Sequence, residues 1–236
     1  MPAIVEADDS GTYVVKFRGA AQGPRALVAE IIAGEIGRLL GLPVPALVLA
    51  DVDPVLARSE PDQEIQELLK KSAGLNVGMD YLPGSLNWEP ALTPPVDRDL
   101  AAKIVWFDAL ISNVDRTPRN PNMLRWHKQL YLIDHGASLY FHHDWGTRME
   151  RSKSPFQPIV RHALLPRASD IDAVDAVFAP LVSEDAITRI VEDVPDDWLD
   201  AEDTPELTRR GYIEYFGARM ETPRAFVVEA ERARKL

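Results

Sequence analysis

Two polar segments in the middle of the chain constrain its fold more than any other feature. In the first, Asp115 stands five residues before Asn120 in a stretch rich in arginine and proline. In the second, fourteen residues after Asn120, Asp134 ends an apolar run and is followed by His135 and Gly136. Carboxylate and amide oxygens are hard ligands that suit Mg²⁺, with phosphate oxygens and water completing its shell. The pattern indicates a fold that brings two loops together around a phosphoryl-transfer site.

The N-terminal part adds a lysine and a glutamate in the order that a nucleotide site needs. A β-branched and aromatic run over residues 13–17 predicts a strand that carries Lys16. After a turn rich in glycine and proline, apolar residues at helical spacing predict a helix over residues 25–40, which contains Glu30 and Glu35. In kinases, an ion pair between a strand lysine and a helix glutamate holds the lysine against the α- and β-phosphates of ATP.

The remaining patterns predict strands early in the chain and helices late. Apolar runs predict a strand over residues 46–52 and another over 74–84, the second leading into a Pro-Gly turn. Apolar residues at i, i+4, i+7 and i+11 predict an amphipathic helix over residues 100–111, and a hairpin is expected over 124–133. In the helical final part, three N-cap patterns predict helix starts at Ser183, Thr204 and Thr222.

Four stretches resemble the HipA-like kinases, in particular the short bacterial HipA-like kinase domains. They cover residues 13–17, 29–45, 111–124 and 132–145, and their amino-acid sequences and order are more specific than any single motif. The final third of the chain fits this family only loosely. The resemblance implies an α+β, two-lobed protein-kinase-like fold, with a small N-terminal sheet lobe that carries one helix and a mostly helical C-terminal lobe.

A proline-rich segment marks the expected boundary between these lobes. It runs from Pro83 to Pro95 and is otherwise polar. Residues 1–84 are accordingly expected to form the N-terminal nucleotide-binding lobe, and residues 85–236 the C-terminal catalytic lobe of one kinase-like domain.

The resemblance also implies a role for each polar residue. Lys16 is expected on the nucleotide phosphates with Glu30 as its partner, and Glu35 is the rival for this pairing. Asp115 is expected to orient the substrate hydroxyl or accept its proton. Asn120 and Asp134 are expected to bind the metal, with Asp134 bridging it to the β- and γ-phosphates.

The segment before the boundary is where a kinase hinge falls. Its backbone is expected to hydrogen-bond the adenine edge of the nucleotide, at Met79, Asp80, Tyr81 and Leu82. The alternative is an ordinary strand and turn with no contact to the nucleotide.

One arginine is a further catalytic candidate. Arg116 directly follows Asp115, where a guanidinium group is able to meet a phosphate or an acidic substrate. The alternative is that Arg116 and its neighbours Arg119 and Arg125 pair with the many carboxylates of the chain.

The resemblance implies a kinase that uses ATP and Mg²⁺ and transfers the γ-phosphoryl group to a Ser/Thr hydroxyl of a protein substrate. One alternative is a kinase of a small-molecule or lipid alcohol. The other is a nucleotide-binding, pseudokinase-like regulatory module. This last reading arises because only residues 1–9 precede the first clear strand, which leaves little chain for a loop covering the phosphates.

Composition excludes several other classes of protein. The net charge of −11 opposes direct binding to nucleic acid, since such proteins present a basic surface. No apolar run approaches the roughly 18 residues of a membrane helix, so neither a membrane partner nor a location outside the cytoplasm is expected. A zinc site from His135, His142, His143 and Asp144 is a weaker reading, because no cysteine or distant histidine completes a tetrahedral set.

Overall fold

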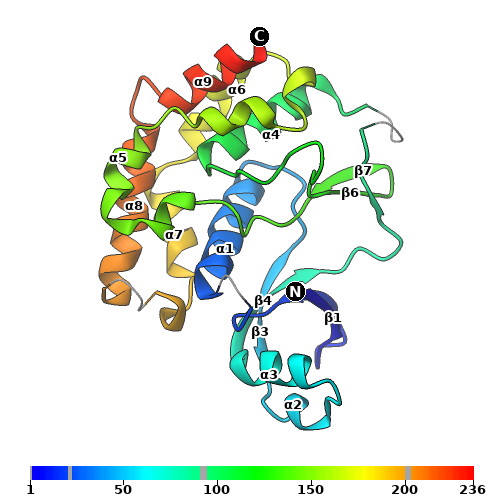
Figure 1. Cartoon of the computed structure of the whole chain (residues 1–236). Coiled ribbons are helices and arrows are strands. Elements are labelled where there is room, and N and C mark those ends of the chain that lie inside the picture. The colour runs from blue at the N-terminus through cyan, green and yellow to red at the C-terminus, as the bar shows by residue number, and fades with distance from the viewer. Residues whose placement is uncertain (1, 21–22, 91–94, 200–202) are drawn as a thin grey trace.

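A four-stranded antiparallel sheet forms one end of the molecule (Figure 1). The computed structural model describes residues 2–20, 23–90, 95–199 and 203–236. The strands are ordered β1-β2-β4-β3, and their bounds are Pro2–Glu6 for β1, Thr12–Lys16 for β2, Leu47–Val52 for β3 and Gly74–Asp80 for β4. Strand β2 lies between β1 and β4 and ends at Lys16.

A second, three-stranded sheet holds the segment that follows the expected lobe boundary. It is ordered β5-β6-β7, with bounds Leu86–Asn87, Met123–Trp126 and Gln129–Leu132. The predicted hairpin is therefore present, joined by a two-residue turn in which both residues have positive φ, the geometry that matches strand twist. Strand β7 ends one residue before Ile133. Strand β5 lies inside the proline-rich segment and was not expected.

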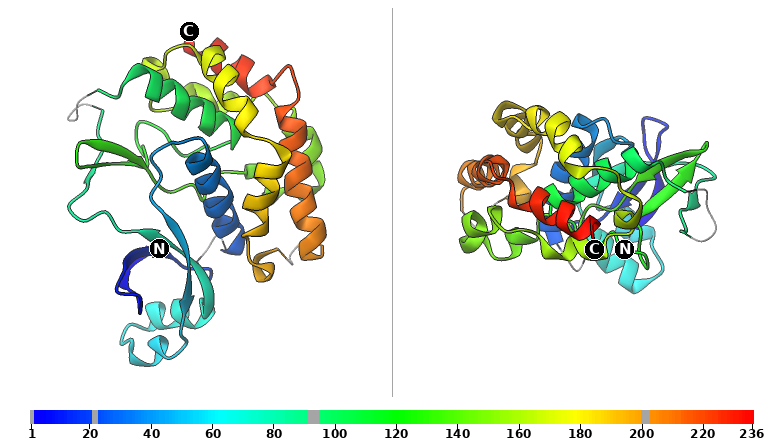
Figure 2. Two further views of the ribbon diagram at one scale, coloured as in Figure 1. Left: turned by 180° about the vertical axis from the view of Figure 1, so that it is seen from behind. Right: turned by 90° about the horizontal axis from the view of Figure 1, so that it is seen from above.

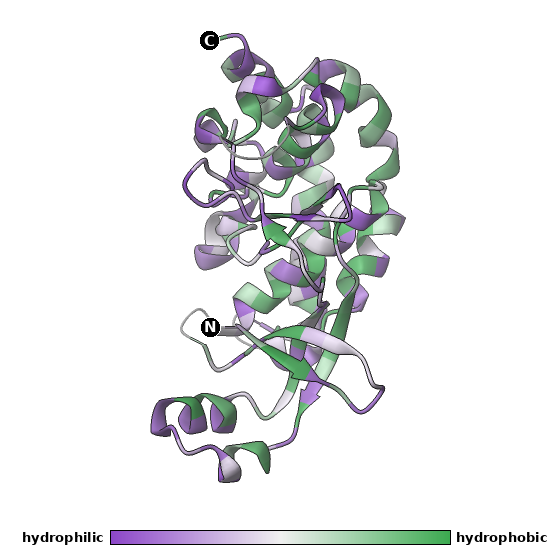
Figure 3. Cartoon of the chain, turned by 90° about the vertical axis from the view of Figure 1, so that its right-hand side faces the viewer, coloured by the Kyte–Doolittle hydropathy of each residue, from purple (hydrophilic) through white to green (hydrophobic). Residues whose placement is uncertain are grey.

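Helices make up most of the remaining chain. The longer ones are α1 (Gly23–Leu39), α3 (Gln63–Lys71), α4 (Arg98–Leu110), α6 (Ile171–Phe178), α7 (Glu184–Glu192), α8 (Pro205–Met220) and α9 (Ala225–Arg234), and the short α2 (Leu56–Ser59) and α5 (Arg148–Ser152) lie between them. In Figure 3, green and purple bands alternate along most helices, as expected for amphipathic helices with one buried face.

Two of the three predicted helix starts are correct. The hydroxyl of Ser183 accepts the Ala186 N–H at the start of α7, and that of Thr204 accepts the Leu207 N–H at the start of α8. The third prediction, Thr222, is wrong. The backbone is still extended at Arg224, with ψ of 103°, so helical geometry in α9 begins only at Ala225.

One large hydrophobic core joins α1 to the C-terminal helices. Helix α4 lies at its centre, where Trp106 is fully buried and makes edge contacts with Phe178 and Phe226 at centroid distances of 5.4 Å. Helix α1 packs on β3, β4 and α7, so it touches both the sheet and the helical part (Figure 2). Because α1 is anchored in this core, its side chains are held firmly opposite β2. None of the described helices is both long and apolar enough to cross a membrane.

Candidate active site

Lys16 is the meeting point of three segments that are far apart in the sequence. Its Nζ lies 2.7 Å from Oε2 of Glu30, on α1, and 2.5 Å from Oδ1 of Asp134, after β7. The expected Lys16–Glu30 ion pair is present. Burial lowers the pKa of Lys16, but the two carboxylates outweigh it and raise this pKa above its usual value, so the side chain is a cation at neutral pH.

Glu30 links the lysine to the loop that carries Asp134. It is fully buried, and the same Oε2 that meets Lys16 also accepts the backbone N–H of His135 at 2.9 Å. Burial raises the pKa of Glu30, but Lys16 and His135 outweigh it and lower this pKa to about 2. Glu35, the rival for the pairing, instead contacts Arg38 on its own helix at 3.3 Å.

Asp134 is positioned by a left-handed backbone conformation. Its φ is 58°, which is uncommon for a residue other than glycine and turns the chain sharply away from β7. Gly136 follows and lies close to α1, where a Cβ would stand 3.5 Å from Oε2 of Glu30. About half of the Asp134 side chain remains exposed, so one carboxylate contacts Lys16 and still faces open space.

The loop after α4 forms a second polar cluster around Asp115. Its Oδ2 accepts hydrogen bonds from the side-chain amides of Asn120, at 2.8 Å, and Asn122, at 3.1 Å. The backbone N–H of Asp115 is held by Oδ1 of Asn113 at 3.0 Å. Both amides turn their nitrogens to Asp115, and no hydrogen bond to either amide oxygen occurs within the described residues.

Asn122 joins the two clusters, and the sequence analysis did not single it out. Its carbonyl accepts the N–H of Ile133, the residue before Asp134, at 3.0 Å. This hydrogen bond ties the backbone of Asn122 to the residue before Asp134. Asn122 is also less exposed than Asn120. The available signal was its place directly before β6, since a residue at a strand end is fixed more tightly than one in mid-loop.

The donor set fits a magnesium ion. The carboxylate of Asp134 and the amide oxygens of Asn120 and Asn122 are hard oxygen donors of the kind that Mg²⁺ takes from proteins. The chain has no cysteine, whose thiolate would favour a softer metal.

Arg116 pairs with a carboxylate, the alternative to the catalytic role considered for it. Its side chain is fully buried, and Nε lies 2.6 Å from Oδ2 of Asp108 on α4. Its Nη1 donates to the carbonyl of Asn122 at 2.5 Å. A guanidinium group enclosed in this way is not presented to a phosphate. Arg116 instead ties the Asp115 loop to the core helix and to the start of β6.

Asp108 is the centre of this buried network. It also accepts hydrogen bonds from Nδ2 of Asn113, at 2.9 Å, and from Nε2 of His162, at 2.8 Å. Burial raises the pKa of Asp108, but Arg116 and His162 outweigh it and hold this pKa well below its usual range. The residues on both sides of Asp115 are therefore fastened to one charged group inside the protein.

The hinge candidates are only partly available to a nucleotide. Met79 and Asp80 end β4, and the N–H of Asp80 is bonded to the Ala46 carbonyl at 2.9 Å. The N–H of Tyr81 is bonded to the Thr12 carbonyl at 3.0 Å. The N–H of Leu82 makes no hydrogen bond within the described segments. Among the N–H groups of Asp80, Tyr81 and Leu82, that of Leu82 is the one the geometry leaves for an adenine edge.

The histidines do not assemble into a zinc site. His135 is buried against Phe107, with ring centroids 5.7 Å apart, while His142 hydrogen-bonds the Tyr212 hydroxyl at 3.1 Å. Across the ranges that the structure describes, three carboxylate or histidine side chains come close enough to share an ion at one place, formed by Asp170, Asp172 and Glu231. The histidines serve in packing instead.

Comparisons with known proteins bear on the family and on the fold. The sequence model of the family described as HipA-like kinase matches residues 1–220. No curated protein matches the chain. Among solved structures, the fold is similar to the crystal structure of the Helicobacter pylori proinflammatory kinase CtkA, with a TM-score of 0.56 and 14% sequence identity over 98% of this chain and 94% of that chain. This likeness confirms the predicted α+β, two-lobed protein-kinase-like fold.

Proposed function

The chain belongs to the HipA-like kinase family, and from this premise we propose that it transfers the γ-phosphoryl group of ATP to a Ser/Thr hydroxyl of a protein substrate, with Mg²⁺ as the metal. One observation carries the proposal: the ammonium group of Lys16 touches both Glu30 and Asp134. A strand lysine, a helix glutamate and a metal-binding aspartate are the groups that a kinase must bring together to hold a triphosphate.

Lys16 and Glu30 act on the nucleotide in this proposal. The ammonium group of Lys16 would contact the α- and β-phosphates, and the buried carboxylate of Glu30 fixes the direction of the lysine side chain. Because Glu30 also holds the N–H of His135, it sets the position of the Asp134 loop at the same time. One residue thus aligns the phosphate-binding and metal-binding groups before substrate arrives.

Asp134, Asn120 and Asn122 would hold Mg²⁺, which neutralises charge on the β- and γ-phosphates when it is bound. The structure supports this because the half-exposed carboxylate of Asp134 lies in a loop joined to that of Asn120 and Asn122, whose amide oxygens accept no hydrogen bond from any described residue. Asn122 is added here to the metal-binding residues expected from the sequence.

Asp115 would orient the acceptor hydroxyl and take its proton. Three asparagine side chains hold this residue: two donate to its carboxylate and one accepts its backbone N–H. Such fixing matters because phosphoryl transfer depends mainly on position and charge neutralisation. Arg116 is not assigned a chemical step, since it is enclosed with Asp108.

Leu82 is the proposed contact for adenine, and the division into lobes at residue 84 is kept as part of the proposal. We place the enzyme in the cytoplasm, where ATP is available. A small-molecule or lipid alcohol is the alternative acceptor. The complete polar set favours catalysis over the regulatory module that binds nucleotide without turnover.

Incubation with labelled ATP and Mg²⁺, read by mass spectrometry for autophosphorylation and by release of ADP, tests the proposal. Replacement of the proposed base by Asp115→Asn is expected to slow transfer by about 10²- to 10⁴-fold, because the hydroxyl loses its general base. The affinity for ATP measured without Mg²⁺ is expected to stay within about threefold, since the proposed role of Asp115 is toward the acceptor rather than the nucleotide.

Asp51→Asn is the matched control, because Asp51 is exposed on β3 and no hydrogen bond or ion pair of its side chain occurs in the described structure. Its transfer rate is expected to equal that of the unchanged protein. Turnover in Asp115→Asn equal to this control would reject the proposed role of Asp115. Binding of ATP without any transfer or hydrolysis in the unchanged protein would favour the regulatory module.

A further inference from the structure

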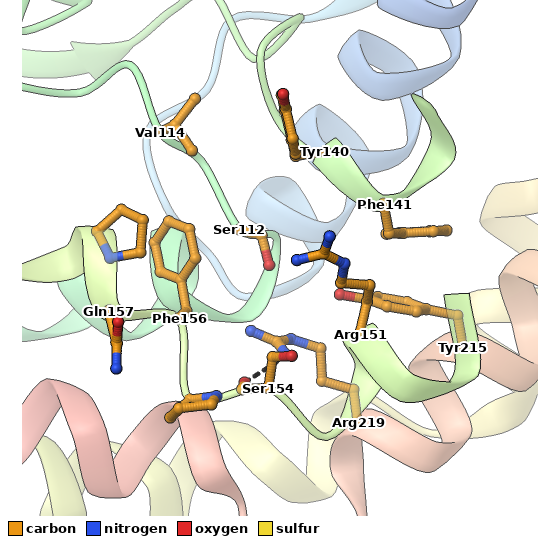
Figure 4. Close-up of a pocket in the computed structure, with 12 residues that line it drawn as sticks. Ser112, Val114, Tyr140, Phe141, Arg151, Ser154, Phe156, Gln157, Tyr215 and Arg219 are labelled. Carbon is orange, nitrogen blue, oxygen red and sulfur yellow. Dashed lines mark hydrogen bonds between the residues drawn. The ribbon is translucent and has the colours of Figure 1, made fainter. Parts of the chain in front are cut away.

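A cavity of about 490 Å³ opens directly beside the proposed catalytic loop (Figure 4). Ser112 and Val114, which precede Asp115 in that loop, form one wall. Tyr140 and Phe141, in the segment after Asp134, form another. The cavity therefore touches both loops of the site, and its volume lies within the range of about 300–1,000 Å³ that small-ligand pockets take.

The floor of this cavity carries a buried positive charge. Arg219, on α8, is almost wholly enclosed, and its guanidinium donates to four backbone carbonyls, at Ala109, Leu110, Ser152 and Ser154. Burial lowers the pKa of Arg219, although an arginine stays charged at neutral pH. Carbonyl dipoles satisfy its donors but do not cancel its net charge.

A second arginine points into the same space. Arg151, on α5, is exposed, and Figure 4 shows its side chain extending into the cavity toward Ser112. It makes no hydrogen bond or ion pair with any described residue. The described lining includes two arginines and no aspartate or glutamate. In a chain with a net charge of −11, this is a local excess of positive charge.

The rest of the lining suits a small ligand with a polar end and an apolar body. The hydroxyls of Ser112, Ser154 and Tyr140 are further polar groups of the wall. Phe156 and Pro155 supply apolar lining. Arginine guanidinium groups match carboxylate and phosphate oxygens in pairs, so an anion is the ligand that this arrangement selects.

We propose that this cavity binds an anionic group, a phosphate or a carboxylate, on the molecule that supplies the acceptor hydroxyl. The inference rests on the proposed kinase function and specifies its acceptor. Because Val114 adjoins Asp115, an acceptor anchored by Arg151 presents a nearby hydroxyl to Asp115. Arg219 supports the anion from the floor through its charge, and Arg151 is the residue that selects it.

Direct binding tests the anion site without any need for turnover. The probes are O-phosphoserine, inorganic phosphate and neutral glycerol, titrated calorimetrically. The two anions are expected to bind saturably, and Arg151→Gln is expected to weaken their binding at least tenfold, while glycerol binds to neither protein. Arg151 is exposed, so this change is expected to leave the fold intact. Arg167→Gln, at another exposed arginine without a described partner, is the matched control.

Two acceptor assays then separate the possible sources of the anion. One offers Ser/Thr peptides with acidic or neutral neighbours, and the other offers glycerol phosphate beside glycerol. Preference for acidic peptides identifies a protein acceptor, and preference for glycerol phosphate identifies a small molecule. Either preference, lost in Arg151→Gln, supports the proposal.

Three results would overturn it: no saturable binding of O-phosphoserine, equal binding by Arg151→Gln and the unchanged protein, or a preference for neutral acceptors. Thermal stabilisation by ATP and Mg²⁺, measured on the same samples, tests the proposed kinase function separately. If the unchanged protein binds O-phosphoserine but is not stabilised by ATP and Mg²⁺, the kinase function is rejected and the anion site is supported.

Discussion

The buried network beneath the catalytic loop predicts an unusually large effect for one small substitution, Asp108→Asn. This change keeps the size and shape of the side chain and removes only its charge. In the protein, Asp108 is fully buried and accepts hydrogen bonds from Arg116, Asn113 and His162. Asparagine leaves the enclosed guanidinium of Arg116 without a counter-charge.

The magnitude follows from this enclosure. Removing one partner of a buried ion pair costs about 3–5 kcal/mol, because the remaining charge stays out of water. Since a whole domain is stable by only about 5–15 kcal/mol, the substitution is expected to remove a large share of the free energy of unfolding. For a chain of this size, the midpoint of thermal unfolding is expected to fall by roughly 6–20 °C.

Urea unfolding followed by tryptophan fluorescence measures the change. Asp51→Asn, an exposed substitution of the same chemistry, is expected to shift stability by less than about 0.5 kcal/mol. The double change Asp108→Leu with Arg116→Met removes both charges and is expected to recover part of the loss, because Asn113 and His162 still lack their acceptor. A cost below about 1 kcal/mol for Asp108→Asn, or a double variant no more stable than the single one, would refute this reasoning.

Two further predictions concern a buried histidine and the lysine partner. Burial, with smaller contributions from His143 and Arg25, lowers the pKa of His142 from 6.5 to about 3, so only the unfolded chain binds its proton between these values. The free energy of unfolding is therefore expected to fall as pH drops below 6.5, by about 2 kcal/mol at pH 5 from this residue. Urea titrations should show a weaker pH dependence of stability in His142→Gln. The same pH dependence in both proteins would contradict this prediction. Glu30→Gln is expected to lower kcat/KM by about 100-fold, because the Lys16 side chain is no longer held in position. Glu35→Gln should leave kcat/KM unchanged. Equal effects of the two substitutions would contradict the assignment of Glu30 as the partner of Lys16.

The sequence predicted those parts of the site that depend on local pattern. A short β-branched run predicted the strand that ends at Lys16, and apolar spacing predicted the helix that carries Glu30. The apolar run before Asp134 gave the hairpin strand to within one residue. In each case the neighbouring residues in the sequence determine the local structure, so that structure can be predicted from one sequence.

The sequence could not predict pairings between distant residues. Nothing near Arg116 shows that Asp108 and His162 enclose it, because that enclosure is made by the packing of α4 against a later turn. The contribution of Asn122 depends on its left-handed backbone, with φ of 49°, which joins it to Ile133. An aspartate among the apolar residues of the second half of α4, from Ile104 to Leu110, was the one available signal of the buried network.

Calorimetric titration with ATP, with and without Mg²⁺, tests most directly whether this chain holds a metal-bound triphosphate. The unchanged protein is expected to bind ATP at least tenfold more tightly with Mg²⁺ than without it. Asp134→Asn is expected to abolish that difference, because the exposed carboxylate beside Lys16 supplies the metal ligand. Equal dependence on Mg²⁺ in both proteins, or no binding of ATP by the unchanged chain, would contradict the account.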